Sequence, residues 1–322
     1  MRIIHSLETA RPERDVVLTI GTFDGVHRGH QLLLGQVVRR ARETGRLSGV
    51  LSFHPHPRTV LHPDISMTYL STPQERADLM ERLGLDLFVL LPFTLEFAAT
   101  PAEPLVRSLV QQLRMRELWV GTDFAMAHQR EANVERLREL GGMLGYDLHT
   151  IEPLTDADRA ISSTRIRALL AEGRVEQAAF LLGRYYSVPG RVVHGAGRGR
   201  SLGFRTANVA PPADRLMPAN GIYAVWMLID GARYAGAANV GVRPSFDNGE
   251  RLLEVHLLDY EGDLYDRQVS TEFVQYIREE RRYDNVEALR RQVARDVEEI
   301  RALLGVTRIP EGADGSGRFS TV

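Results

Sequence analysis

The stretch GTFDGVHRGH, residues 21–30, decides the fold of the first half of this chain. It follows the apolar run of residues 16–20, whose β-branched side chains are typical of a buried strand. After it, apolar residues recur with the 3.6-residue spacing of an amphipathic helix, which is expected to end at Gly45. A strand, a glycine-broken turn and a helix therefore follow one another here.

Two histidines, His27 and His30, stand at the start of this helix. Residues three apart share one helix face, so both imidazoles can face one ligand. Free backbone N–H groups and the positive end of the helix dipole make a phosphate the expected ligand. An isolated pair of this kind is more often structural, and together with His54 and His56 it could instead bind zinc. The prolines beside His56 hold that segment extended, which counts against a chelating pair.

Strands and helices alternate along the rest of the first half. Further strands are expected at residues 49–53, 86–91, 117–121 and 146–151. Helices are expected after Thr72 and Thr100, each of which is followed by proline and by a capping-box glutamate, and again from Val134. The alternation predicts the α/β class, with a Rossmann-like parallel sheet covered by helices on both faces. Ligands of such sheets bind at the carboxyl ends of the strands, where residues 21–30 are expected.

The pattern changes near Gly183. Short alternating or β-branched runs then stand between glycine-rich turns, at residues 187–193, 222–229, 234–240, 252–258 and 268–276. They predict an antiparallel β-barrel or sandwich, followed by a closing helix over residues 285–304. We therefore expect a first domain of residues 1–183, a second of residues 184–307, and a disordered tail of residues 308–322.

The composition limits the class of protein. Its 40 basic and 42 acidic residues give a formal charge of −2, so no basic surplus predicts a nucleic-acid or membrane partner. No apolar run reaches the length of a membrane span, and the absence of cysteine excludes disulfides and thiolate chemistry. The expected location is the cytoplasm. The chain also lacks lysine, which excludes a P-loop, so arginine, histidine, backbone N–H groups and a metal ion would have to handle nucleotide phosphates.

Other phosphate-binding groups are expected at the same edge of the sheet. Residues 162–167, SSTRIR, open a short helix with hydroxyl groups and continue with two arginines. The segment HPHPR, residues 54–58, follows the second strand, and GTDF, residues 121–124, follows the fourth. Their convergence on strand ends predicts a phosphate site more strongly than any one of them.

Three of these motifs together resemble a known family. GTFDGVHRGHQ at residues 21–31, HPHP at residues 54–57 and ISSTRIR at residues 161–167 are similar to the adenylyltransferase module of the bacterial bifunctional riboflavin kinase/FAD synthetase family. The resemblance implies that an FMN phosphate attacks the α-phosphorus of ATP and expels pyrophosphate, with Mg²⁺ screening the anions. A phosphate nucleophile needs no general base, so the site has to position two anions and stabilise the five-coordinate phosphorus.

The same resemblance implies roles for individual residues. His27 and His30 are the implied catalytic residues, which would stabilise the negative charge that develops on the five-coordinate α-phosphorus. The residues implied for ATP and its phosphates are Gly21, Phe23, Asp24, Gly29, Ser163, Thr164 and Arg167. Those implied for the flavin are His56, Asp123, Phe124 and Arg130. Where the family commonly has two glycines, this chain has Ala127 and Ala132, and alanine is expected to exclude the positive φ that glycine permits.

The second half carries a loop rich in glycine and arginine, residues 190–208. Its backbone N–H groups could approach a polyphosphate, although this composition alone more often belongs to a surface loop. Thr206 and Asn208 alternate along an extended segment, so both oxygens face one side and can meet a metal ion.

This loop also resembles the family, through its riboflavin kinase module. The match continues through NGIYA at residues 220–224, NVGVRPSF at residues 239–246 and LEVHLL at residues 253–258. It implies that Glu254 takes the proton of the ribityl 5′-hydroxyl as that oxygen attacks the γ-phosphorus of ATP. It also implies ATP contacts from Gly195, Gly203, Thr206 and Asn208, with Mg²⁺ at the last two. Arg205 stands where the family has proline, which frees φ and adds a charge beside the triphosphate.

The two resemblances cover nearly the whole chain except its tail. The leading hypothesis is a bifunctional enzyme that makes FMN from riboflavin and FAD from FMN, with riboflavin, FMN and ATP as its partners. Two alternatives stay open at this point: an enzyme that retains only one activity, and a non-catalytic flavin-binding regulator.

Overall fold

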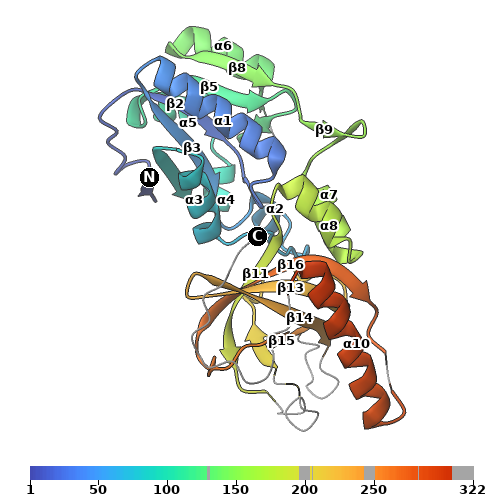
Figure 1. Ribbon diagram of the computed structural model, residues 1–322. Coiled ribbons are helices and arrows are strands. Elements are labelled where there is room, and N and C mark those ends of the chain that lie inside the picture. The colour runs from blue at the N-terminus through green and yellow to red at the C-terminus, as the bar shows by residue number, and fades with distance from the viewer. Residues whose placement is uncertain (129–130, 196–203, 205, 243–250, 282, 307–322) are drawn as a thin grey trace. The chain divides into compact units, whose positions relative to one another are not determined.

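The computed structural model of the protein describes residues 1–128, 131–195, 204, 206–242, 251–281 and 283–306 (Figure 1). These residues form two compact units. The first comprises Met1–Arg167, Leu181–Gly183 and Asp214–Leu216, and the second comprises the described parts of Ala168–Phe180, Arg184–Ala213 and Met217–Val322. The tail expected at residues 308–322 lies outside the described residues.

A six-stranded parallel sheet forms the centre of the first unit. In sheet order its strands are β1 (Arg2–Ile4), β4 (Leu87–Leu91), β3 (Leu47–Phe53), β2 (Val16–Ile20), β5 (Met115–Gly121) and β8 (Asp147–Ile151). The order reverses between β2 and β5, because β3 and β4 lie on one side of β2 whereas β5 and β8 lie on the other. In an open α/β sheet, the crevice at such a reversal is the usual place for a ligand, outside the carboxyl ends of the strands.

Helices cover both faces of this sheet, as the sequence predicts (Figure 1). The helices α1 (Arg28–Glu43) and α3 (Pro73–Arg82) pack on the face that carries Val17. The helices α5 (Ala102–Gln112) and α6 (Val134–Leu144) pack on the face that carries Leu18 and Ile20. Successive strand residues point to opposite faces, so all five residues of β2 are buried.

Most of the predicted helix signals are confirmed. Thr72 and Glu75 form the capping box of α3, and Gly45 follows α1 with a φ of 66°. The helix predicted after Thr100 is present as α5, but its predicted cap is wrong, because the N-cap is Pro101, which makes no side-chain cap hydrogen bond. Thr100 does not cap this helix, and the Ala102 N–H instead donates to Glu131 Oε1 at 2.5 Å.

Several short elements complete the first unit and lead out of it. The helices are α2 (Pro57–Leu61), α4 (Leu95–Ala98), α7 (Ser163–Ala171) and α8 (Val175–Leu182). The hairpins are β6 (Ala125–Met126) with β7 (Ala132–Asn133) and β9 (Thr155–Asp156) with β10 (Arg159–Ala160). Asp214–Leu216 belongs to this unit because Tyr69 N–H donates to Asp214 O at 2.7 Å and Arg215 pairs with Glu75 at 2.5 Å.

The second unit is a closed antiparallel barrel, which confirms the barrel rather than the sandwich. Around the barrel its strands are β11 (Tyr186–Val193), β12 (Ala207–Ala210), β15 (Arg251–Leu257), β14 (Ala232–Val242), β13 (Gly221–Ile229) and β16 (Gln268–Arg278). Alternate residues of each strand fill the interior, among them Val225, Val255 and Phe273. The predicted closing helix is α10 (Val286–Leu304), which is capped by Asn285 and Gly305 and packs Ile300 against Ala224 and Ala235.

Candidate functional site

The loop between β2 and α1 turns back through residues with positive φ. Phe23, Gly25 and Val26 have φ values of 50°, 80° and 39°. Phe23 and Val26 bury their side chains in the core beneath α1, which holds a backbone that such residues rarely adopt. A Cβ on Gly25 would lie 2.9 Å from the side chain of Leu70, so this position requires glycine. The loop is thus fixed by packing, and it delivers His27 to the start of α1.

The carboxylate of Asp24 fastens this loop to two other segments. It is 2% exposed and accepts hydrogen bonds from the N–H of Leu70 and the N–H and hydroxyl of Ser71, at 3.0–3.1 Å. Arg167 of α7 forms an ion pair with the same carboxylate, and the Ser163 hydroxyl donates to Asp24 O at 2.8 Å. The family resemblance implies an ATP contact for Asp24. In the structure its side chain is engaged by donors of the chain itself, and it holds the loop against the start of α7.

His27 and His30 lie face to face. His27 is the N-cap of α1, and its Nδ1 accepts a hydrogen bond from the His30 N–H at 3.3 Å. Their rings stack with centroids 3.6 Å apart and an interplanar angle of 19°. Two glycines make room for the aromatic rings: a Cβ would lie 3.0 Å from Phe23 if added to Gly21, and 3.3 Å from His27 if added to Gly29.

The environment of His30 keeps its imidazole uncharged. Burial lowers its pKa well below the ordinary 6.5, and the nearby His27 lowers it further. The edge of Phe23 closes one side, with ring centroids 5.0 Å apart. Nδ1 of His30 is buried and has no hydrogen-bond partner among the described residues. The stack therefore offers a neutral ring nitrogen that is not engaged within the described part of the chain.

Arg76 of α3 is a buried cation that the sequence did not reveal. It is 2% exposed, and its Nη1 donates to Thr22 O at 2.7 Å, Ser52 Oγ at 2.9 Å and Phe53 O at 3.4 Å. Burial lowers its pKa, and its Nε and Nη2 have no partner within the described chain. The guanidinium joins the end of β3 to the loop after β2. Its helical position is apolar in most amphipathic helices, so the sequence pattern gives no signal for it.

The HPHP segment contributes two histidines at the end of β3. His56 is the N-cap of α2, where its Nδ1 accepts from Arg58 N–H at 3.1 Å. Burial and the charge of Arg167 lower the pKa of His56 to about 4. Burial and the charge of Arg76 lower the pKa of His54, whose Nδ1 has no partner in the described structure. Both imidazoles are therefore neutral at pH 7.

The predicted phosphate-binding residues at the start of α7 differ in how far they are buried. Ser163 and Arg167 are half-buried against Asp24, whereas Thr164 is exposed. The Nε of Arg167 donates to Thr68 O at 3.1 Å. Because guanidinium has five N–H donors, the group retains donors beyond these two contacts. Ser163 and Arg167 are thus joined to the loop that carries His27, as the sequence predicts.

The residues predicted after β5 are not tied to this cluster by any contact in the described structure. Asp123 is exposed, and Phe124 packs against the core beneath α5 and α6. Arg130 lies outside the described residues. The expectation that alanine excludes a positive φ is wrong for Ala127, which has a φ of 66°, while Ala132 is fully buried in β7. Packing around Ala127 therefore imposes the backbone that glycine adopts freely.

On the barrel, the predicted kinase residues lie in one row across neighbouring strands. Asn208 of β12 pairs with Glu254 of β15, and Glu254 pairs with Asn239 of β14. Asn208 is 7% exposed, and a Cβ on Gly195 would lie 2.2 Å from its amide, so Gly195 gives this side chain its space. Thr206 is half-buried just before β12. Gly203 lies outside the described residues, as does Arg205.

The oxygen donors of this row fit Mg²⁺. The Oδ1 of Asn208 is buried and has no hydrogen-bond partner among the described residues. Mg²⁺ is a hard cation that binds oxygen ligands, and Thr206, just before β12, adds a hydroxyl oxygen to the amide oxygen of Asn208. Within the described ranges, no group of three or more His, Asp or Glu side chains is arranged for a metal ion.

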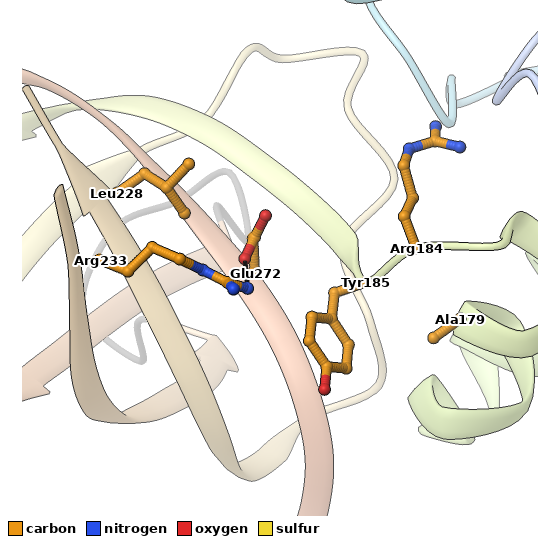
Figure 2. Close-up of a pocket in the computed structure, with 6 residues that line it drawn as sticks. All are labelled: Ala179, Arg184, Tyr185, Leu228, Arg233 and Glu272. Carbon is orange, nitrogen blue, oxygen red and sulfur yellow. Dashed lines mark hydrogen bonds and ion pairs between the residues drawn. The ribbon is translucent and has the colours of Figure 1, made fainter. Parts of the chain in front are cut away.

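A cavity of about 580 Å³ lies on the second unit, away from these predicted residues (Figure 2). Ala179, Arg184, Tyr185, Leu228, Arg233 and Glu272 line it. Figure 2 shows that Arg233 and Glu272 point toward one another, and they form an ion pair. Arg233 also lies 5.9 Å from the ring centre of Tyr185. Because Arg233 and Glu272 are already paired with each other and none of the predicted site residues lines it, this cavity is a weaker candidate than the two clusters above.

Two protein-family models match the chain. The FAD synthetase model matches residues 9–165, and the riboflavin kinase model matches residues 182–304. Every helix of the described chain is too short or too polar to cross a membrane.

Curated relatives match over nearly the whole length. The chain is 39% identical to the bifunctional riboflavin kinase/FMN adenylyltransferase of Pseudomonas fluorescens, covering 94% of this chain and 98% of the relative. It is 36% identical to the protein of the same description from Escherichia coli (strain K12), covering 96% and 98%. Among solved structures, one described as a macrolide-efflux protein from Streptococcus pneumoniae is 30% identical and superposes with a TM-score of 0.86, covering 93% of this chain and 98% of that one.

Proposed function

The chain belongs to the bifunctional riboflavin kinase/FMN adenylyltransferase family, and on this premise we propose which of its residues perform the two reactions. The enzyme phosphorylates riboflavin to FMN and adenylylates FMN to FAD, with ATP as the co-substrate of both steps. We assign the adenylylation to residues 1–183 and the phosphorylation to residues 184–307, because one family model matches residues 9–165 and the other residues 182–304, two residues across this boundary. Since both steps consume ATP, the proposal places the enzyme in the cytoplasm.

The stacked pair His27 and His30 is the observation that carries the adenylyltransferase assignment. The pKa of His30 is lowered well below 6.5, so at pH 7 this imidazole acts as a hydrogen-bond partner rather than as a cation. As the α-phosphorus of ATP becomes five-coordinate, negative charge grows on its oxygens. Preformed donors at the N-terminus of α1 stabilise that charge without reorganising.

The start of α7 binds the remaining ATP phosphates in this proposal. Arg167 keeps part of its guanidinium for phosphate oxygens while Asp24 holds the group in place. Ser163 and Thr164 add hydroxyl donors, and Gly21, Phe23 and Gly29 shape the loop along which the nucleotide lies. Asp24 then acts by positioning Arg167 and not by touching ATP.

FMN supplies its own nucleophile in this step. Its phosphate oxygen is anionic at neutral pH, so the site needs alignment of two anions and no general base. The proposed flavin contacts are His56, Asp123, Phe124 and Arg130. Neutral His56 beside Arg167 adds no like charge to the cation that attracts the phosphates.

Riboflavin phosphorylation requires a base, because an alcohol must lose its proton to become a strong nucleophile. We propose that Glu254 accepts the proton of the ribityl 5′-hydroxyl as the oxygen attacks the γ-phosphorus of ATP. Thr206 and Asn208 are the proposed residues for Mg²⁺, and the proposed ATP contacts also include Gly195 and Gly203. When bound, Mg²⁺ screens the charge of those phosphates.

A pair of variants in the full chain tests the assignment. Replacing His30 with alanine is expected to lower FAD formation from FMN by about a hundredfold or more, ~3 kcal/mol of transition-state stabilisation, while FMN formation from riboflavin persists. Glu254→Ala is expected to do the reverse. The measurement is chromatographic separation of riboflavin, FMN and FAD after incubation with MgATP. Equal loss of both activities in either variant would contradict two separate sites.

A further inference from the structure

One residue in the polar row on the barrel, Asn239, has no role in the proposed kinase reaction. Asn239 is the register partner of Glu254 on β14, as Asn208 is on β12. Side chains that face each other across neighbouring strands point to the same side of the sheet. Leu253 and Val255, which flank Glu254 along β15, are buried in the barrel interior, so the row lies on its outer side.

The two amides of the row share an unusual property. The Oδ1 atoms of Asn208 and Asn239 are both buried, and neither has a hydrogen-bond partner among the described residues. A buried acceptor without a donor loses the hydrogen bonds that water would give it, which is unfavourable. Two such acceptors on either side of a carboxylate are what a site for a ligand rich in donors would present.

The order Asn208, Glu254, Asn239 across the strands determines which amide lies on the side of the ATP phosphates and which on the side of the alcohol. Neighbouring strands are about 4.8 Å apart, so Glu254 stands between Asn208 and Asn239 at that spacing. In phosphoryl transfer the attacking oxygen, the phosphorus and the leaving oxygen lie roughly in line. With the metal-bound phosphates at Asn208 and the base at Glu254, the chain of the alcohol extends towards Asn239.

We propose that Asn239 binds the polyol chain of the alcohol substrate, with its Oδ1 accepting a hydrogen bond from a secondary hydroxyl. The proposal rests on the assignment of Glu254 as base and Asn208 as metal ligand. Each secondary hydroxyl of a ribityl chain can donate one hydrogen bond. The Asn239 Oδ1 is an acceptor that has no donor among the described residues. Asn239 thereby positions the primary hydroxyl over Glu254 and distinguishes a flavin with a polyol chain from one without it.

Equilibrium binding tests this without turnover. The probes are riboflavin and lumiflavin, whose ring system is the same but which carries no hydroxyls, each titrated by flavin fluorescence in the presence of MgADP. Asn239→Leu is expected to weaken riboflavin binding about tenfold, the loss of one hydrogen bond, and to leave lumiflavin binding within about twofold. Asn239→Asp, which keeps an acceptor oxygen, is expected to recover most of the riboflavin affinity.

Several results would overturn the proposal. One is equal weakening of both flavins by Asn239→Leu, and another is unchanged riboflavin binding. A third is loss of Mn²⁺ affinity with riboflavin affinity intact, which would make Asn239 a metal ligand instead. Gln275→Ala on β16 is the matched control, since it truncates an amide side chain of the barrel outside the row, and it is expected to change neither flavin.

A different result would refute the proposed kinase mechanism on which this inference rests. Glu254→Gln that still phosphorylates riboflavin at the normal rate would refute Glu254 as base. The flavin titrations with the Asn239 variants do not depend on that rate. Retained lumiflavin binding also shows that the Asn239→Leu barrel is folded.

Discussion

His56 couples the stability of the first unit to pH. Burial and the neighbouring Arg167 lower its pKa from the ordinary 6.5 to about 4, so the folded state resists protonation that the unfolded chain accepts. The free energy of unfolding should therefore fall as the pH drops from about 6.5 towards 4, and level off below the folded-state pKa. Burial lowers the pKa values of His30 and His54 too, and both add to the same trend.

The variant His56→Asn isolates this contribution. Asparagine also caps a helix N-terminus but does not titrate, so the cap of α2 is retained while the proton-binding site is lost. Urea unfolding at pH 7 and pH 5 is expected to show a smaller loss of stability for the variant than for the parent chain. The same pH dependence in both proteins would show that His56 does not contribute.

Ala127 stores backbone strain that glycine would relieve. Its φ of 66° lies in the left-handed region, which costs an L-residue roughly 1 kcal/mol. Ala127→Gly is therefore expected to stabilise the first unit by up to about 1 kcal/mol, measured by denaturant unfolding. Ala125→Gly serves as the control, because Ala125 lies in β6 without a positive φ, and there glycine should destabilise. A destabilised Ala127→Gly chain would contradict the strain.

At the scale of single residues, the sequence predicted what depends on local spacing and missed what depends on tertiary contacts. The three-residue spacing of His27 and His30 placed both rings on one face, and the structure stacks them. The resemblance implied an ATP contact for Asp24, but no sequence pattern showed that its partners lie near residues 70 and 167. Arg76 gave no signal, since its buried position becomes clear only when β2, β3 and α3 are assembled.

Among the elements, α1 and β5 are joined by a buried charge. Glu117 of β5 is fully buried and accepts hydrogen bonds from Arg40 of α1 at 2.9 Å and from Arg46 at 2.5 Å. Burial alone would raise the pKa of Glu117, but hydrogen bonds from Arg40 and Trp119 outweigh it and lower that pKa. The carboxylate therefore holds the end of α1 against the sheet.

Glu117→Gln is expected to destabilise the chain by about 2 kcal/mol, because it leaves two guanidinium groups beside a neutral amide. The loss is set below that of a fully buried pair, since both arginines are partly exposed. The free energy of unfolding is measured with guanidinium chloride for Glu117→Gln and for a control, Glu139→Gln, which removes an exposed ion pair on α6. The second substitution should change stability by no more than about 0.5 kcal/mol, and equal effects would count against the buried network.

The long elements were predictable and the short ones were not. The periodicity of α1 and α10 and the β-branched runs of β2 and β13 carry enough residues to define a pattern. The helices α2 and α4 and the two-residue strands β6 and β9 are too short to show any period. Contacts with the surrounding structure, rather than a pattern in their own sequence, determine where these short elements form. The N-cap of α5 was mispredicted because Glu131, distant in sequence, supplies the carboxylate there.

For the whole molecule, the proposed assignment makes the two reactions separable between chains. His30→Ala retains the proposed kinase residues, and Glu254→Ala retains the proposed adenylyltransferase residues. Each variant alone is expected to convert almost no riboflavin to FAD, whereas an equimolar mixture should do so, because FMN released by one chain is the substrate of the other. Chromatography of the flavins over time measures this. A mixture that accumulates FMN without FAD would show that free FMN cannot be used.

The two units also differ in how they can join further chains. The strands of the barrel form a closed ring, so each described strand has neighbours on both sides. The parallel sheet, by contrast, ends at β1 and β8, each of which pairs with a described strand on one side only. Edge strands of this kind are where foreign strands add and where aggregation begins. If partly unfolded chains cross-link into β-rich aggregates, the nucleotidyltransferase sheet offers the edges for it, while the kinase barrel must first be opened.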